Sequence, residues 1–194
     1  MLIVITGLDG SGTSSIAEEL HKLDKNSYLF KTPSSEFSDR NSIDSLIKPV
    51  SPTAHMLYYL SSTVFMSDYI KQNCDYINNN VYLVRYLIDT VVSNRVAGVS
   101  IDLNYQLFGN QLLVPDLTLF VHLNEEERQR RITSRGKTEL DKVLDDDLKR
   151  KKFLEEFRNN LDSTSTIYVD NSDENIEQTV QKTYKKILDY KSKK

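Results

Sequence analysis

Five short apolar runs, spread along the chain, predict five β-strands. The first run is almost entirely apolar, which is typical of a strand buried on both faces of a parallel sheet. The runs are short, as expected for strands that are bounded by turns and polar segments. They cover residues Leu2–Thr6, Tyr28–Lys31, Val81–Tyr86, Leu117–Leu123 and Thr166–Asp170.

Between the runs, apolar residues recur at helical spacing. Ser14 to Leu23 shows this pattern, and Pro52 to Ile70 is long enough for a helix of about five turns. Asn124 lies three residues before Glu127, which is the spacing of an N-cap and its N3 residue. Residues 176–187 predict an amphipathic helix near the end of the chain. Strands that alternate with helices predict an α/β fold whose parallel sheet is covered on both faces.

Composition narrows the class further. A chain of 194 residues is long enough for one domain with one core, so we expect a single domain over residues 1–194. Its net charge of −3 argues against a protein held on nucleic acid by phosphate contacts. Its one cysteine, Cys74, excludes an intramolecular disulfide and favours a reducing, cytoplasmic setting. The three histidines show no spacing typical of zinc ligands. With no apolar run long enough to span a bilayer and no signal peptide, we expect no membrane attachment.

The strongest chemical signal is a glycine-rich loop between the first strand and the first helix. Three of the six glycines of the chain lie in it. Glycines allow backbone N–H groups to turn around an anion, and the following helix contributes its positive N-terminus. The spacing is that of the P-loop, G-x-x-x-x-G-K-[ST], so we expect phosphate binding, with Ser14 as the Mg²⁺ ligand. The alternative is a strand-to-helix turn without a ligand. The candidate residues are Gly7, Asp9, Gly10, Ser11, Gly12, Thr13, Ser14 and Ser15.

One residue departs from the P-loop pattern, because Thr13 stands where the lysine is expected. That lysine places a positive charge against the β- and γ-phosphates of a bound nucleotide. A threonine supplies a hydroxyl group without charge, so the substitution is expected to weaken transition-state stabilisation more than anion binding. Lys31, Lys137 and Lys142 are candidates for a replacement cation, although an exposed lysine is usually only solvated.

Further landmarks follow the loop in a recognisable order. Together with Gly-Leu-Asp-Gly-Ser-Gly they resemble the thymidylate kinase family, from Leu2 to about Ile187. Lys31-Thr32-Pro33 stands where the family has Arg-Glu-Pro, and Val84-Arg85-Tyr86 where it has Asp-Arg-Tyr. The remaining landmarks are Leu57-Tyr58-Tyr59-Leu60-Ser61-Ser62-Thr63, Pro115-Asp116-Leu117-Thr118-Leu119, the run from Arg131 to Arg135-Gly136, and Val169-Asp170.

This resemblance implies a P-loop kinase fold with a five-stranded parallel sheet and a short helical lid at about residues 131–150. It implies transfer of the γ-phosphoryl group of ATP, with Mg²⁺, to a nucleoside monophosphate such as dTMP, and homodimers are usual in the family. A packing face on the helix over 52–70 is one way to form such a dimer. The roles implied are acceptor phosphate binding by Arg85, contact with the ATP phosphates by Arg131 and Arg135, and acceptor binding by Asp9, Pro33, Tyr59, Thr63 and Tyr86.

Several charged positions of the family are neutral here. Thr13 replaces a lysine, Thr32 an acid, Thr63 an arginine and Val84 an aspartate. A nucleotide-binding protein with weakened catalysis therefore stays open as an alternative, as does a kinase for another small hydroxyl acceptor.

Plainer interpretations of single residues also stay open. Arg85 is also explained by a structural ion pair, and Tyr59 by a place in the core. Asp89 is either a site carboxylate or a helix-start residue. We expect Arg128 and Arg130 to pair with Glu125–Glu127 or to face water, and Asp145–Asp147 to form charge pairs on a solvated helix.

Overall fold

The structure is a computed structural model that describes residues 1–137, 139–172 and 175–193. Its centre is a five-stranded sheet in which every neighbouring pair is parallel, in the order β2-β3-β1-β4-β5. This arrangement confirms the five predicted strands and the α/β class. The strands are β1 (Leu2–Gly7), β2 (Tyr28–Lys31), β3 (Val81–Val84), β4 (Leu117–His122) and β5 (Thr166–Asp170).

β3 ends two residues earlier than the apolar run predicted. Arg85 has a φ of 68°, in the left-handed region that residues other than glycine rarely adopt. The chain therefore turns away from the sheet at Arg85, and Tyr86 becomes the N-cap of the next helix instead of a strand residue. The turn places the Arg85 side chain at the carboxyl edge of the sheet.

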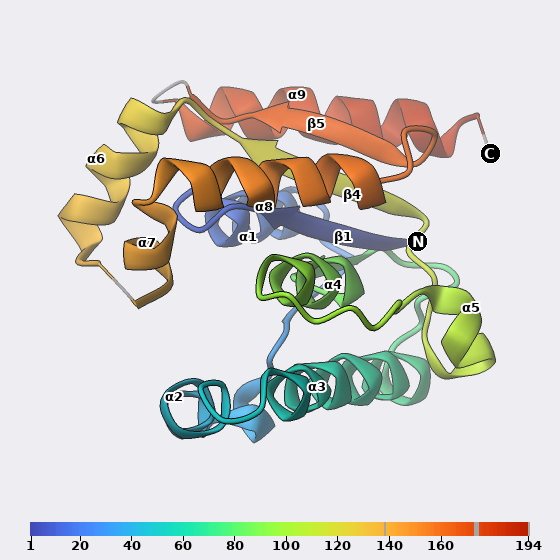
Figure 1. Ribbon diagram of the computed structural model, residues 1–194. Coiled ribbons are helices and arrows are strands. Elements are labelled where there is room, and N and C mark those ends of the chain that lie inside the picture. The colour runs from blue at the N-terminus through green and yellow to red at the C-terminus, as the bar shows by residue number, and fades with distance from the viewer. Residues whose placement is uncertain (138, 173–174, 194) are drawn as a thin grey trace.

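Helices cover both faces of the sheet (Figure 1). Alternate residues of β1 explain this, because Ile3 and Ile5 pack with one helical layer and Leu2 and Val4 with the other. The first layer contains α1 (Thr13–Leu23) and α9 (Ile176–Lys191). The second contains α3 (Pro52–Asn73), α4 (Leu87–Val96) and α8 (Asp147–Asn160).

The remaining elements connect the strands to the helices of these two layers. They are η1 (Ser35–Phe37), α2 (Arg40–Ser42), η2 (Ile43–Ile47), α5 (Tyr105–Phe108), η3 (Gly109–Gln111), α6 (Glu125–Arg135) and α7 (Glu139–Leu144). In Figure 1, α6 and α7 project beyond the sheet on the same side as α2, with the two groups in different layers. None of the described helices is both long and apolar enough to cross a membrane.

Local sequence signals mark the helices that border the site. The Ser51 side chain accepts a hydrogen bond from the Ala54 N–H, and Pro52 follows at the first helical position of α3. Asn124 caps α6 by accepting from the Glu127 N–H at 2.8 Å, as its spacing predicted. Residues from the first turns of α3 and of α6, His55 and Glu127, line the same cavity.

Candidate active site

A cavity of about 1340 Å³ opens at the carboxyl edge of the sheet. Ligands of open α/β sheets usually bind at this edge. A site for one small molecule occupies roughly 300–1000 Å³, so this cavity has room for two nucleotides. Every site residue predicted from the sequence lines it except Ser11, whose side chain is buried in the loop.

The glycine loop forms one end of the cavity, and two of its glycines are required by close contacts. A Cβ atom on Gly7 would lie 2.2 Å from the Val121 carbonyl oxygen. A Cβ atom on Gly12 would lie 2.5 Å from the Asn171 amide nitrogen, and the φ of Gly12 is 92°. Any larger residue would displace the loop from β4 or from Asn171. The loop therefore has the tight backbone that a phosphate cradle needs.

Besides Arg85, two side chains from outside the loop hold its carbonyl groups, and the sequence did not indicate either of them for this role. The Arg128 guanidinium donates to the Asp9 carbonyl at 3.1 Å, and the Asn171 amide donates to the Ser11 carbonyl at 2.8 Å. Asn171 directly follows β5 at the carboxyl edge, which is a signal that could have found it. Arg128 pairs with Glu125 at 2.7 Å and is buried, so of the two expected alternatives, an ion pair or exposure to water, the ion pair is the one that forms.

Thr13 begins α1 and is buried, so the loop presents no charged side chain of its own at the lysine position. Thr13, Ser14 and Ser15 all line the cavity. The ammonium group of Lys31 donates to the Ser14 hydroxyl at 3.4 Å. Lys137 instead pairs with Asp145 at 2.8 Å, and neither Lys137 nor Lys142 is among the described residues that line the cavity.

Arg85 is held between two carboxylates. Its guanidinium contacts Asp9 at 2.6 Å and Asp89 at 2.6 Å, and it also donates to the Gly7 carbonyl. Burial by itself would lower the pKa of Arg85, but Asp89 and Asp9 outweigh it and raise that pKa above the ordinary value. The side chain is still 22% exposed toward the cavity. Both interpretations of Arg85 therefore apply, because it forms structural ion pairs and also faces a ligand space.

Asp89 likewise combines its two predicted roles. Its carboxylate accepts from the Tyr86 N–H at 3.0 Å, which caps α4, and from the Thr6 hydroxyl at 2.7 Å. Thr32, which stands where the family has an acid, donates its hydroxyl to the Arg85 carbonyl at 2.8 Å. Thr32 is buried, so its side chain supports the unusual backbone of Arg85.

The other end of the cavity is formed by α3 and by residues 40–48. The Tyr59 ring lines the cavity, and its hydroxyl donates to the Asp44 carboxylate at 2.8 Å. Asp44 also lies 2.8 Å from the Nε2 atom of His55. Burial alone would raise the pKa of Asp44, but these hydrogen bonds outweigh it and lower that pKa. The carboxylate is therefore ionised at neutral pH. Sequence reasoning missed Asp44 and His55, because their partners come together only in the fold.

The remaining acceptor residues predicted from the resemblance also line this end. Thr63 is buried, and its hydroxyl donates to the Tyr59 carbonyl at 3.1 Å. Tyr86 is almost fully buried, and its ring stacks with Tyr105 at a centroid distance of 6.2 Å. Pro33 follows β2 at the cavity wall. None of these three residues carries a charge, and the charged side chains at this end are those of Asp44, Arg40 and Lys48.

Arg131 and Arg135 reach the cavity from α6, as the resemblance implied. Arg131 pairs with Glu127 at 2.5 Å and donates to the Asn171 carbonyl at 2.8 Å. Arg135 contacts both oxygens of the buried Asp141 carboxylate on α7, at 2.8 and 3.0 Å. Each of the two arginines thus ties α6 to a neighbouring segment.

The hydroxyl of Ser14, at the start of α1 and on the cavity wall, is the group expected to hold Mg²⁺. Mg²⁺ in kinases keeps several waters and binds few protein ligands beside the substrate phosphates, so one hydroxyl at the start of α1 fits it. Among the described residues, no group of three or more His, Cys, Asp or Glu side chains forms a metal cluster. Asp147, from the acidic run, pairs with Lys151 at 2.6 Å and with Arg150, as expected for a solvated helix.

A parallel sheet in this strand order, with a P-loop at its carboxyl edge and arginines beside the loop, defines the chain as a protein of the P-loop kinase fold. Comparison with known proteins identifies the family. Residues 5–183 match the family model for thymidylate kinase, so the chain belongs to the thymidylate kinase family. It is therefore a phosphotransferase of the nucleoside monophosphate kinase class.

Individual relatives agree with this assignment. The thymidylate kinase of Brachyspira hyodysenteriae is 27% identical over 139 residues, which are 68% of this chain and 67% of that protein. The solved structure of thymidylate kinase from Candida albicans matches with a TM-score of 0.71 at 24% identity, over 98% of this chain and 92% of that one. Deoxyadenosine kinase from M. mycoides matches with a TM-score of 0.69 at 18% identity, over 97% of this chain and 100% of that one. The two structures support the fold.

Proposed function

We propose that this chain transfers the γ-phosphoryl group of ATP to a (deoxy)nucleoside monophosphate, with dTMP or a related nucleotide as the acceptor. One observation carries the proposal: the phosphate loop and Arg85 line the same cavity, and Asp9 links them. ATP phosphates then occupy the loop, and the acceptor phosphate lies at Arg85. Transfer between two bound phosphates depends mainly on positioning and charge neutralisation, which such a cavity can provide.

The two ends of the cavity take the two nucleotides. Arg131 and Arg135 on α6 approach the ATP phosphates, and residues 131–150 act as the lid. Tyr59 stacks on the acceptor base, while Asp9 contacts the acceptor sugar and Tyr86 disfavours a 2′-hydroxyl. Mg²⁺, held by Ser14 and the nucleotide phosphates, supplies further positive charge to the group in transfer. The chain itself orients both substrates and excludes water.

The base of the acceptor is the least constrained part of the proposal. Thr63 has no charge with which to read a base, whereas the Asp44 carboxylate faces the same end of the cavity. A carboxylate accepts hydrogen bonds from an exocyclic amino group or a ring N–H. A test of the acceptor should therefore include, beside dTMP, nucleotides whose bases carry an exocyclic amino group or a ring N–H. The solved Candida albicans enzyme is itself described as having broad substrate specificity.

The test is direct phosphoryl transfer. Purified protein is incubated with ATP, Mg²⁺ and each of the deoxy- and ribonucleoside monophosphates, and the products are resolved by chromatography. We expect conversion of dTMP, or of one related acceptor, to the diphosphate. Arg85→Lys should raise the acceptor KM by about tenfold or more, because an ammonium group cannot replace the two-pronged guanidinium. Arg158→Lys, at an exposed position of α8, is the matched control and should change nothing.

A second function is favoured by one specific observation, the buried uncharged Thr13 at the lysine position. In this alternative the chain binds nucleotides but catalyses transfer poorly, and acts as a sensor, regulator or partner-binding module. Saturable nucleotide binding without any product in the same panel would favour it over the kinase. A third candidate, a kinase for another small hydroxyl acceptor, would show ATP consumption only with a nucleoside or similar alcohol.

We further propose a cytoplasmic homodimer that packs through α3. The exposed apolar side chain of Leu57 on this helix supports that proposal. The oligomeric state is measured by light scattering on the purified chain.

A further inference from the structure

Most basic side chains around the phosphate loop already form ion pairs with carboxylates. Arg85 is flanked by two carboxylates, Asp9 and Asp89, so these three side chains together carry a net charge of about −1 at neutral pH. Nucleotide phosphates bring several negative charges into the cavity. The loop therefore needs positive charge from another source than the arginine at its edge. Arg135 is paired with Asp141 and Arg128 with Glu125, while Arg130 and Arg131 share the single carboxylate of Glu127.

Lys31 differs from these arginines. It is the last residue of β2, at the carboxyl edge of the sheet, and it lines the cavity. Its ammonium group lies 3.4 Å from the Ser14 hydroxyl, at the first turn of α1. Among the described residues, no carboxylate lies within ion-pair distance of it. Lys31 therefore keeps an uncompensated charge beside the part of the loop that would hold the β- and γ-phosphates.

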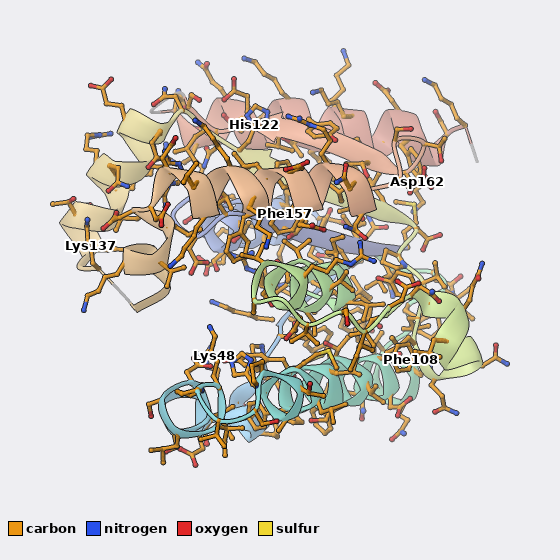
Figure 2. All side chains as sticks on the ribbon, in the orientation of Figure 1. Lys48, Phe108, His122, Lys137, Phe157 and Asp162 are labelled. Atoms are coloured by element: carbon orange, nitrogen blue, oxygen red, sulfur yellow. The ribbon has the colours of Figure 1, made fainter. Side chains whose placement is uncertain are left out.

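The two remaining basic residues at the cavity wall lie elsewhere. Arg40 and Lys48 belong to the segment that borders the acceptor end. Figure 2 shows the Lys48 side chain extending from this lower layer toward the space between the layers. Lys48 also acts electrostatically on Asp44, which is part of that end. Lys31 contacts the phosphate loop, whereas Arg40 and Lys48 lie at the acceptor end.

We propose that Lys31 supplies the positive charge that the phosphate loop lacks at Thr13. The inference rests on the proposed kinase function and adds a catalytic residue to it. During transfer, an acceptor phosphate oxygen forms a bond to the γ-phosphorus, the bond from that phosphorus to the bridging oxygen breaks, and ADP leaves with the electron pair. Lys31 neutralises charge on the oxygens of the group in transfer. A lysine serves this purpose well because its stem is flexible and its charge compact.

The experiment compares four variants of the full chain with the wild type. Lys31→Met removes the charge and keeps much of the stem, while Lys31→Arg keeps the charge. Lys25→Met is the matched control at the exposed turn that follows α1, at the end of that helix away from the loop. The double variant Thr13→Lys/Lys31→Met returns the charge at the ordinary P-loop position. Turnover, acceptor KM and the Kd of a fluorescent ATP analogue are measured for each.

We expect Lys31→Met to lower kcat by about 10²–10³-fold, as for loss of one stabilising group in a transition state. It should also weaken ATP binding while leaving the acceptor KM nearly constant. Lys31→Arg should retain most of the turnover, and the double variant should regain at least about tenfold over Lys31→Met. Lys25→Met should match the wild type. The recovery by Thr13→Lys is a result that a purely structural role for Lys31 does not produce.

Other outcomes overturn the proposal. If Lys31→Met keeps kcat and ATP affinity within about twofold of Lys25→Met, Lys31 is only a solvated lysine. If it changes the acceptor KM alone, Lys31 binds the acceptor and not the ATP phosphates. If the wild type converts no acceptor, the proposed kinase function fails. The affinity for the ATP analogue then tests the role of Lys31 by itself. A loss of affinity specific to Lys31→Met then still assigns the cation to the loop, and unchanged affinity rejects it.

Discussion

At the floor of the cavity, two carbonyl groups of the phosphate loop are held by side chains from distant parts of the chain. Arg128 donates to the Asp9 carbonyl, and Asn171 donates to the Ser11 carbonyl. Both donors are buried, so the carbonyl groups lose a protein partner and gain no water if either donor is removed. These two hydrogen bonds tie the backbone of the loop to α6 and to the end of β5.

Asn171→Ala tests this connection. We expect the free energy of unfolding to fall by about 1–3 kcal/mol, because the Ser11 carbonyl would stay buried without its donor. ATP binding should weaken as well, since the loop loses one constraint on its shape. Urea unfolding followed by circular dichroism gives the stability, and titration with the fluorescent ATP analogue gives the affinity.

Asn73→Ala is the matched control for that measurement. The Asn73 amide donates to the Tyr69 carbonyl at 2.9 Å, but it lies exposed at the end of α3, where water can replace it. Its loss should cost little stability and leave ATP affinity unchanged. Equal effects of the two substitutions would show that the bond from Asn171 contributes nothing specific to the loop.

At the scale of elements, the arginines of α6 lie on different faces of the helix. Arg128 points to the buried side, Arg130 is 63% exposed, and Arg131 lies between them against Asn171. Glu127 accepts hydrogen bonds from both Arg130 and Arg131. These bonds, with that from Arg130 the largest, lower the pKa of Glu127 to about 2. One carboxylate thus fixes two arginines on the helix that is expected to act as part of the lid.

This arrangement predicts a specific dependence of stability on pH. The pKa of Glu127 is lowered on folding from an ordinary value of about 4.3, so its contribution is complete above that pH and is lost as the pH falls toward 2. We expect the wild type to be more stable than Glu127→Gln near neutral pH. The difference should shrink progressively below about pH 4. Urea unfolding between about pH 7 and pH 3 measures it.

The exposed Glu155 of α8 supplies the comparison, since no ion pair joins its carboxylate to another described residue. The free energy of unfolding of Glu155→Gln should differ little from that of the wild type. This difference should not shrink below about pH 4 as that for Glu127→Gln does. A difference for Glu127→Gln that stays constant down to pH 3 would contradict the pairing seen on α6.

The elements themselves followed closely from the sequence, because apolar runs and helical spacing are local signals. All five strands and the helices that flank the loop were predicted, and so were the N-cap at Asn124 and part of the cavity wall, from which Asp44 and His55 were missed. Other features depend on contacts between distant residues. The left-handed turn at Arg85 is supported by Thr32 from another strand, and Asp44 acquires its role only when α3 brings His55 and Tyr59 against it. No local pattern encodes such contacts.

On the scale of the whole molecule, the cavity is bordered by parts of the chain that are far apart in sequence. Residues 40–48 and α3 form the acceptor end, and α6, α7 and α8 contribute to the opposite wall, as the separation of these layers in Figure 1 illustrates. A ligand that fills one end contacts only part of this boundary. Occupying both ends at once joins the two layers through the ligand.

A single molecule that carries both nucleosides should therefore bind much more tightly than either nucleotide alone. We expect adenosine and thymidine joined by a chain of phosphates to bind about 10²–10⁴-fold more tightly than ATP, because the second binding event becomes intramolecular. Calorimetric titration with chains of four, five and six phosphates measures the affinities. One length should be best, since a chain that cannot span the two ends gains nothing. Adenosine pentaphosphate without the second nucleoside is the matched control. Equal affinity for it and for every linked compound would mean that the cavity holds one nucleotide, and that its acceptor end must be sought elsewhere.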